Sequence, residues 1–253
     1  MTRPIAFQMY AVREDLAKDF DKVMDAVASV GYAGIEMISW IPGATPEHAA
    51  RRLKELGLKV PCAHVPVPYG VDEQSVMAFA EQFGVERLVT GRFADSFDTL
   101  DHIKETCDAY NKGAEAAKRH GYTLSIHNHW MEFERAADGR YVYEIMLELL
   151  DPSVLFEIDI YWVKTAGLDP ADIIRKLGKR VNLLHIKDGP AVIEPPQVAL
   201  GEGVVDIAAA VNAAESAEWL IVELDHCATD MVEALQKSYH YLVNEGLGHG
   251  KNA

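Results

Sequence analysis

Short runs rich in β-branched and aromatic residues alternate along the chain with longer segments of helical period. Such an alternation is typical of parallel strands joined by crossover helices. The sequence therefore predicts eight strands, at residues 5–10, 34–39, 59–65, 87–91, 123–129, 155–161, 182–188 and 220–225.

The segments between these strands carry helix start and stop signals. DFDKVMDAVASVG, TPEHAARRLKELG and SVMAFAEQFG each end in a glycine, which is common directly after a helix. Thr45 and Pro46 predict an N-cap and first-turn pair. Eight strand–helix units need about 250 residues to close into a barrel, so we predict one α/β domain, a (β/α)₈ TIM barrel over residues 1–253. An open doubly wound sheet is the alternative, but no GxGxxG motif follows the first strand.

Polar and apolar side chains alternate within the strands, and successive residues of a strand point to opposite faces. In the strand at 155–161, Phe156 and Ile158 share one face while Glu157 and Asp159 share the other. The polar face of the predicted strands carries Glu36, His64, His127, His129, Glu157, Asp159, His185, Lys187, Glu223 and Asp225. These residues lie near the carboxyl ends of their strands, where TIM barrels have their active sites.

Charge and composition exclude several classes of partner. The chain has 24 Lys and Arg against 39 Asp and Glu, a formal net charge of −15, which repels polyanions and anionic membrane surfaces. Nucleic acids and membranes are therefore not expected as partners. The three cysteines, Cys62, Cys107 and Cys227, form neither a CxxC pair nor an even disulfide framework. Without a signal-type segment or an apolar run of about 20 residues, we expect a cytoplasmic protein.

A cluster of buried carboxylates and imidazoles in one barrel mouth is costly without a compensating cation. A divalent metal ion accepts both types of ligand, so the cluster predicts a metal site. The alternative is a purely structural network of hydrogen bonds. Mixed His and carboxylate ligands suit Mn²⁺, Co²⁺, Zn²⁺ or Fe²⁺, and Mg²⁺ is also compatible.

Several stretches of the sequence match one known superfamily in order and position. They are GYAGIEM (31–37), IHNHWMEF (126–133), IDIYWVKTAGLDP (158–170), LLHIKD (183–188), LGEGVVDI (200–207) and IVELD (221–225). Through them the chain resembles the xylose isomerase-like barrel superfamily, and specifically its sugar phosphate isomerase/epimerase group. The resemblance covers nearly the whole chain. It implies a divalent metal held by ligands from strands 5, 6, 7 and 8, and a homo-oligomer, either a dimer or a tetramer.

The family's ligand pattern is Glu, Asp, His and Glu. Carried over to this chain, it matches Asp159 on strand 6, His185 on strand 7 and Glu223 on strand 8. The strand 5 position departs from the pattern, because His127 stands where ketose epimerases have a glutamate. The predicted metal ligands are therefore His127, Asp159, His185 and Glu223, with His129 as the alternative on strand 5.

Further residues receive predicted roles at this site. Glu223 and His127 are candidate catalytic bases, and Glu132 could contact a substrate hydroxyl or assist proton transfer. The predicted substrate-binding residues are Glu36, His64, His129, Trp162 and Lys187. Trp162 either forms a flat wall against a sugar or packs at the barrel rim, and Lys187 either balances a carboxylate or holds a substrate oxygen. Gln8, Arg13 and Trp40 are additional pocket candidates.

Proton abstraction next to a carbonyl is the chemistry that such a site suits, because a metal ion stabilises the enediolate that forms. We therefore predict a metal-dependent isomerase or epimerase that acts on a keto-sugar. The alternative is a dehydratase or lyase on a keto-inositol or a 3-keto-glycoside. A non-catalytic sugar-binding barrel is a third possibility. The superfamily also contains metal-dependent endonucleases, but the charge of −15 disfavours binding to a phosphate backbone.

Overall fold

Parallel strands close into an eight-stranded barrel in the computed structural model, which describes residues 2–194 and 196–251. The barrel strands are β1 (Arg3–Gln8), β2 (Gly34–Ile38), β3 (Cys62–His64), β4 (Arg87–Thr90), β5 (Thr123–His127), β6 (Leu155–Asp159), β7 (Val181–Ile186) and β8 (Trp219–Val222). The barrel is closed because β1 pairs with both β2 and β8. A short additional strand, β9 (Gly248–His249), pairs with Arg3 and Pro4 at the start of β1. The predicted TIM barrel is confirmed.

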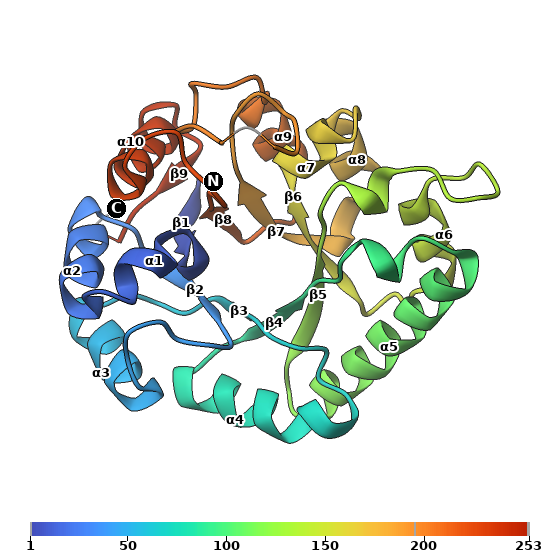
Figure 1. The fold of residues 1–253 in the computed structure, drawn as a ribbon, viewed down its shortest axis with the longest axis horizontal. Helices are drawn as coiled ribbons and strands as arrows, with labels where there is room; N and C mark the ends of the chain where they lie inside the picture. The colour runs from blue at the N-terminus through green and yellow to red at the C-terminus, as the bar shows by residue number, and fades with distance from the viewer. Residues whose placement is uncertain (1, 195, 252–253) are drawn as a thin grey trace.

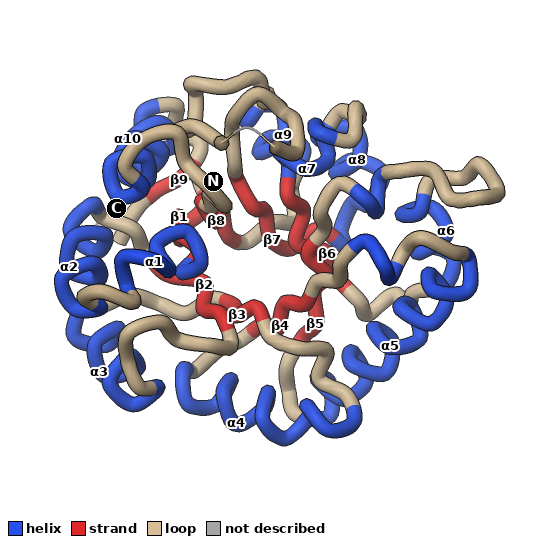
Figure 2. Tube along the Cα trace, in the orientation of Figure 1, coloured by secondary structure: helices blue, strands red, loops and turns tan. Residues whose placement is uncertain are grey.

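Helices surround the strands on the outside, as Figures 1 and 2 show. Those that follow the barrel strands are α2 (Phe20–Val30), α3 (Pro46–Leu56), α4 (Glu73–Phe83), α5 (Leu100–Arg119), α6 (Val142–Leu149), α8 (Pro170–Leu177), α9 (Ile207–Ala213) and α10 (Met231–Asn244). Two short helices, α1 (Arg13–Leu16) and α7 (Ile160–Thr165), lie in the connections after β1 and β6. Thr45 caps α3 ahead of Pro46, as predicted. No helix in the described part of the chain is long and apolar enough to cross a membrane.

All eight barrel strands end earlier than the sequence predicts. The first strand was predicted to extend to residue 10, but β1 ends at Gln8 and is followed by the 3₁₀ helix η1 (Met9–Val12). Of the segment predicted as a strand over 59–65, only the residues of β3 form one. The predicted strand 155–161 stops at Asp159, whose carboxylate accepts hydrogen bonds from the backbone N–H groups of Tyr161 and Trp162 and thereby starts α7. Glu223 follows β8 directly instead of lying within it.

The apolar side chains form two separate layers. Outward-facing residues such as Ile158 and Val222 belong to a large cluster that also includes the apolar faces of the surrounding helices. The inward-facing residues Ala6, Ala33, Cys62, Val89, Leu183, Trp219 and Ile221 form a smaller cluster inside the barrel. The predicted alternation of faces is therefore confirmed. This inner apolar layer lies on the amino-terminal side of the barrel, and the polar inward residues lie beyond it at the carboxyl ends of the strands.

Candidate functional site

A cavity of about 410 Å³ opens at the carboxyl ends of the strands. It is lined by Gln8, Tyr10, Ile38, Ser39, Trp40, His64, Val65, Pro66, Gly91, Phe93, His127, His129, Glu223 and Asp225. This is the end of a TIM barrel at which active sites lie. The volume falls within the range of about 300–1,000 Å³ that is typical of pockets for small molecules.

The four predicted metal ligands lie together, and two of them, His127 and Glu223, line this cavity. His127, Asp159, His185 and Glu223 are all buried and can each offer one ligand atom, and these atoms lie within 4.8 Å of one another. His127 Nε2 is 4.0 Å from Asp159 Oδ2, and His185 Nδ1 is 2.9 Å from Glu223 Oε2. Four different strands, β5 to β8, thus bring their carboxyl ends to one point.

Two buried glutamates orient the histidines from behind. Glu157 Oε2 lies 3.1 Å from His127 Nδ1, which leaves Nε2 of the same ring directed toward Asp159. Glu36 Oε2 lies 2.5 Å from His185 Nε2, which leaves Nδ1 directed toward Glu223. Metal-binding histidines usually contact a carboxylate through the nitrogen that does not bind the metal. Both rings have this arrangement.

Lys187 supplies a buried positive charge beside the cluster. Its Nζ lies 2.7 Å from Glu223 Oε2, 2.8 Å from Asp225 Oδ2 and 3.0 Å from Asp159 Oδ2. The lysine side chain is only 1 % exposed, so these contacts are shielded from solvent. The contact with Asp159 is an ion pair without hydrogen-bond geometry, because Asp159 Oδ2 is buried and accepts no hydrogen bond from the described residues.

The carboxylates at the site differ in pKa. Burial raises the pKa of Asp159 to about 6, despite the opposing effect of Lys187. Burial and the nearby charge of Glu36 raise the pKa of Glu157 to about 7. Burial acts in the same direction on Glu223, but Lys187 and His185 outweigh it and hold the pKa of Glu223 below its ordinary value. Glu223 is therefore ionised at neutral pH.

The histidines differ in the same way. Burial and the neighbouring His185 lower the pKa of His127 well below its ordinary value, so this ring is neutral. Burial and Lys187 lower the pKa of His129 to about 4. For His185, burial alone would lower the pKa, but the surrounding glutamates outweigh it and raise the pKa. Burial alone would also lower the pKa of His64, which lines the cavity, but Glu36 and Glu157 outweigh it and raise this pKa. The cavity thus combines an ionised carboxylate with the neutral imidazoles of His127 and His129.

These donors fit a divalent cation. Transition metals bind to mixed sets of imidazole and carboxylate ligands, and this cluster has two of each. The other ring nitrogen of each histidine contacts a further carboxylate, Glu157 for His127 and Glu36 for His185. Asp159 Oδ2 is a buried acceptor without a hydrogen bond, and such an atom is expected where a ligand belongs. His127, Asp159, His185 and Glu223 could therefore hold the metal ion.

The other predicted site residues fall into two groups. His64 and His129 line the cavity. Glu36, Trp162 and Lys187 are buried and do not line it, so they can act on a ligand only through the residues in front of them. Trp162 packs against Trp130 with ring centroids 5.1 Å apart, which is the rim packing considered for it above.

Glu132 is also buried away from the cavity. Its Oε2 accepts a hydrogen bond from the backbone N–H of His129, and its Oε1 has no partner among the described residues. Burial raises its pKa to about 8, against hydrogen bonds from the backbone. In this position Glu132 supports the turn that carries His129.

Sequence reasoning missed a role for Glu157 and for two aromatic residues of the cavity. Glu157 has the same parity as Asp159 on β6, and this signal could have identified it. Its Oε2 lies within 3.1 Å of ring nitrogens of His64, His127 and His185. Tyr10 lies in the segment predicted as a strand and shares the parity of Gln8, so alternation could have indicated it. Phe93 lines the cavity from a connection, where strand alternation gives no signal.

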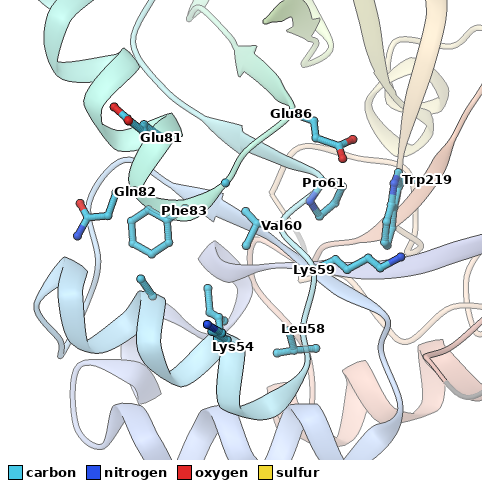
Figure 3. A pocket seen from close by; sticks show the side chains of 13 residues that line it. Lys54, Leu58, Lys59, Val60, Pro61, Glu81, Gln82, Phe83, Glu86 and Trp219 are labelled. Carbon is cyan, nitrogen blue, oxygen red and sulfur yellow. The ribbon is translucent and has the colours of Figure 1, made fainter. Parts of the chain in front are cut away.

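A second cavity, of about 540 Å³, lies at the amino-terminal end of the barrel (Figure 3). It is lined by Ala50, Leu53, Lys54, Leu58, Lys59, Val60, Pro61, Glu81, Gln82, Phe83, Gly84, Glu86 and Trp219. No histidine contributes to this lining, and the carboxylate and histidine cluster lies at the other end of the strands. The cavity at the carboxyl ends is therefore the candidate site.

Solved structures with the same fold include enzymes and a zinc-binding protein. A sugar phosphate isomerase/epimerase from Parabacteroides distasonis ATCC 8503 is 22% identical, with a TM-score of 0.82 over 96% of this chain and 94% of that one. The probable 3-DHS dehydratase AsbF from Bacillus anthracis is 14% identical, with a TM-score of 0.73 over 95% and 98%. The IOLI protein, whose structure has a bound zinc atom, is 14% identical, with a TM-score of 0.72 over 95% and 97%.

No curated protein gives a significant match to the chain. A family model described as the xylose isomerase-like TIM barrel matches residues 24–242, which is most of the sequence. This match agrees with the closed barrel and with the cluster at the carboxyl ends of its strands. The chain belongs to the xylose isomerase-like TIM barrel family.

Proposed function

We propose that this protein is a divalent-metal-dependent isomerase or epimerase that acts on a keto-sugar. The observation that carries the proposal is the position of Glu223, an ionised carboxylate that lines the cavity and adjoins three further potential metal ligands. The names of structural relatives, which include a sugar phosphate isomerase/epimerase and a protein with bound zinc, support the same class of chemistry.

The reaction begins with removal of a proton from the carbon beside the substrate's carbonyl. A divalent cation held by His127, Asp159, His185 and Glu223 would polarise that carbonyl and so acidify the neighbouring C–H bond. Glu223 accepts the proton. Its Oε2 is held by His185 and Lys187, while its Oε1 has no hydrogen bond from the described residues and is the oxygen available for this role. His185 and Lys187 thus position the base without blocking it.

Return of the proton decides the product. If the proton returns to the same carbon on the opposite face, the sugar is epimerised, and if it returns to the neighbouring carbon, the sugar is isomerised. His129 lines the cavity just beyond the end of β5 and is the candidate group for proton return or for hydroxyl binding, because the ring nitrogens of His127 face Glu157 and the metal cluster.

Loss of a β-hydroxyl is the second candidate outcome. The resemblance in fold to a probable dehydratase is consistent with this outcome. Both outcomes share the first proton transfer to Glu223, so one experiment tests their common step.

Solvent exchange tests this step directly. The protein, loaded with Mn²⁺, is incubated in D₂O with ketoses, keto-inositols and 3-keto-glycosides, and deuterium incorporation is followed by NMR. We expect exchange with at least one substrate and a loss of about 10³-fold or more in Glu223→Gln, as for removal of a general base. Glu202→Gln, a change at an exposed glutamate outside the cavity, serves as the control. Exchange that is equally fast in Glu223→Gln would rule the proposal out.

A further inference from the structure

The buried ammonium of Lys187 rests on two of the groups that could hold the metal ion. It contacts Asp159 and Glu223, which belong to the candidate ligands, and it also contacts Asp225. Asp225 is not one of the four candidate ligands. An ammonium and a divalent cation repel each other, and both are attracted by the same two carboxylates. The position of the Lys187 charge therefore affects how tightly the site can bind a metal ion.

Two contacts of Lys187 do not involve the candidate ligands. Its Nζ donates a hydrogen bond to Asp225 Oδ2 at 2.8 Å. The ammonium also lies 5.5 Å from the centroid of the Trp162 ring, and the face of an indole attracts a cation. An acid and an aromatic ring thus give the ammonium a position beside the ligand cluster, which it can keep when the ligands are bound to a metal ion.

Gln197 holds Asp225 through both ends of its side-chain amide. Its Nε2 donates a hydrogen bond to Asp225 Oδ2 at 2.9 Å, and its Oε1 accepts one from the backbone N–H of Asp225 at 2.7 Å. Gln197 itself is buried, its backbone N–H donates to the carbonyl of His226, and its carbonyl accepts from the N–H of Ala228. The β7–α9 connection is thereby joined to the residues that follow β8.

The side chain of Gln197 does more than join these two connections. The backbone hydrogen bonds of Gln197 already link them, so its amide is not required for that purpose. The amide Nε2 instead contacts the same oxygen, Asp225 Oδ2, that accepts the hydrogen bond from Lys187. It therefore fixes the one carboxylate oxygen that draws the ammonium away from Asp159 and Glu223.

We propose that Gln197 and Asp225 form an anchor that holds the Lys187 ammonium beside the candidate metal ligands and thereby sets the affinity of the site for a divalent cation. The proposal rests on the metal dependence of the proposed function and names the residues that tune it. Without the anchor, the ammonium depends on Glu223 and Asp159, and a metal ion has to displace it from both. Gln197 acts through Asp225 and is a positioning residue.

Metal binding without substrate tests the anchor. Mn²⁺ is titrated into the chelator-treated protein at neutral pH, and free Mn²⁺ is quantified by EPR. Gln197→Met has a side chain of similar size and keeps all nearby charges, but it removes both side-chain hydrogen bonds to Asp225. We expect its Kd to be about tenfold higher than that of the parent, as for other residues that support a metal site from behind its ligands. Gln74→Met, at an exposed position on α4, is the control and should bind as the parent does.

A double-mutant cycle shows whether Gln197 acts through Lys187. Lys187→Met removes the competing ammonium and should bind Mn²⁺ about tenfold more tightly than the parent. This variant is purified with Mn²⁺ present, so that the cation supports its fold, and its Kd is measured by competition with a chelator. Addition of Gln197→Met to Lys187→Met should change the Kd by less than about twofold. A tenfold loss in this background too would overturn the anchor.

Asp225→Asn provides a second background for the cycle, which does not depend on the folding of Lys187→Met. It breaks the anchor itself, so Gln197→Met should add no further loss of Mn²⁺ affinity. Full additivity of the two changes would show that Gln197 does not act through Asp225 and would refute the proposal.

These measurements separate the anchor from the proposed catalysis. Weaker Mn²⁺ binding in Gln197→Met supports the anchor even if no substrate exchanges deuterium. Equal Kd values for Gln197→Met and the parent overturn the anchor and leave the proposed function intact. Failure of both the parent and Lys187→Met to bind Mn²⁺ overturns the anchor together with the metal dependence.

Discussion

At the scale of single residues, the site is organised around Glu157. One of its carboxylate oxygens lies 2.9 Å from His64 Nε2 and 3.1 Å from both His127 Nδ1 and His185 Nε2. Each of these rings comes from a different strand. A single buried carboxylate therefore fixes three imidazoles, and the orientation of potential metal ligands is set before any ligand is bound.

Glu132 offers a residue-scale test through pH. Its folded pKa of about 8 exceeds its ordinary value of 4.5, so between these values the folded chain keeps a proton that the unfolded chain has lost. The free energy of unfolding of the parent should therefore fall as pH rises from 5 to 7.5, by about 1 kcal/mol per pH unit relative to Glu132→Gln, which does not titrate. Urea denaturation at a series of pH values measures this difference.

Glu134→Gln is the matched control for that series, because Glu134 lies two residues away and is exposed. It should follow the pH dependence of the parent. Parallel curves for the parent and Glu132→Gln would show that Glu132 ionises in the folded chain as it does in water.

The residues of the candidate site were accessible to sequence reasoning to different degrees. Strand parity predicted that Asp159, His185 and Glu223 face inward together, and the family motif singled them out as a set. The role of Glu157 depends on which ring nitrogens lie close to its carboxylate, and a one-dimensional pattern does not contain such distances. Exposed Phe93 lies in a connection, where neither parity nor helical period applies.

At the scale of elements, the connection from β7 to α9 is built around one carboxylate. Asp188 is buried and accepts hydrogen bonds from the backbone N–H groups of Gly189, Gly201, Gly203 and Val205. A Cβ atom at Gly203 would collide with this carboxylate, so the glycine is needed for the close approach. The LGEGVVDI stretch thus serves to wrap the connection around Asp188.

Asp188→Asn should destabilise the protein by about 2 kcal/mol. In asparagine, an NH₂ group replaces one of the two carboxylate oxygens that accept hydrogen bonds from the backbone. Because this NH₂ group is itself a donor, some of the buried backbone N–H groups would lose their acceptor. Chemical denaturation measures the loss, and limited proteolysis should show earlier cleavage between residues 189 and 205. Asp206→Asn is the control in the same connection, because Asp206 caps α9 and asparagine caps a helix equally well. Equal stability of Asp188→Asn and the parent would contradict the role of this carboxylate.

Element boundaries were predicted less well than element order. The strand at 155–161 contains β-favouring residues to its end, yet β6 stops where the Asp159 side chain caps α7. The hydrogen bonds to the Asp159 side chain start a helix at a point where the strand could otherwise continue. The composition of the segment does not show which of these two structures forms. The two-residue β9 was not predicted, because its pairing with Arg3 and Pro4 links distant parts of the chain.

At the scale of the whole molecule, the fold determines where the site lies, and the net charge determines which partners are excluded. The barrel places the cluster at the carboxyl ends of its strands, and the chain carries a formal net charge of −15. The length, the alternation of strands and helices and the absence of a GxGxxG motif were enough to predict the closed barrel, because few topologies join eight parallel strands through helices.

The acidic charge predicts that DNA does not bind. A duplex containing an abasic site should show no measurable affinity in fluorescence anisotropy at 150 mM salt, because few lysines and arginines are available to displace counterions from the phosphates. A scrambled intact duplex of equal length is the control. Saturable binding that prefers the abasic duplex would instead point to the nuclease branch of the superfamily.

Removal of a bound metal should leave the fold intact, because Lys187 offsets part of the negative charge of the site. Its ammonium contacts Asp159, Glu223 and Asp225. After treatment with a chelator, the protein should keep a cooperative thermal transition in circular dichroism, and addition of Mn²⁺ should raise its Tm. Loss of the transition would show that the metal is part of the fold. For the metal-dependent enzyme proposed above, a lysine in this position would allow the polypeptide to fold first and to take up its metal ion afterwards, in two separate stages of maturation.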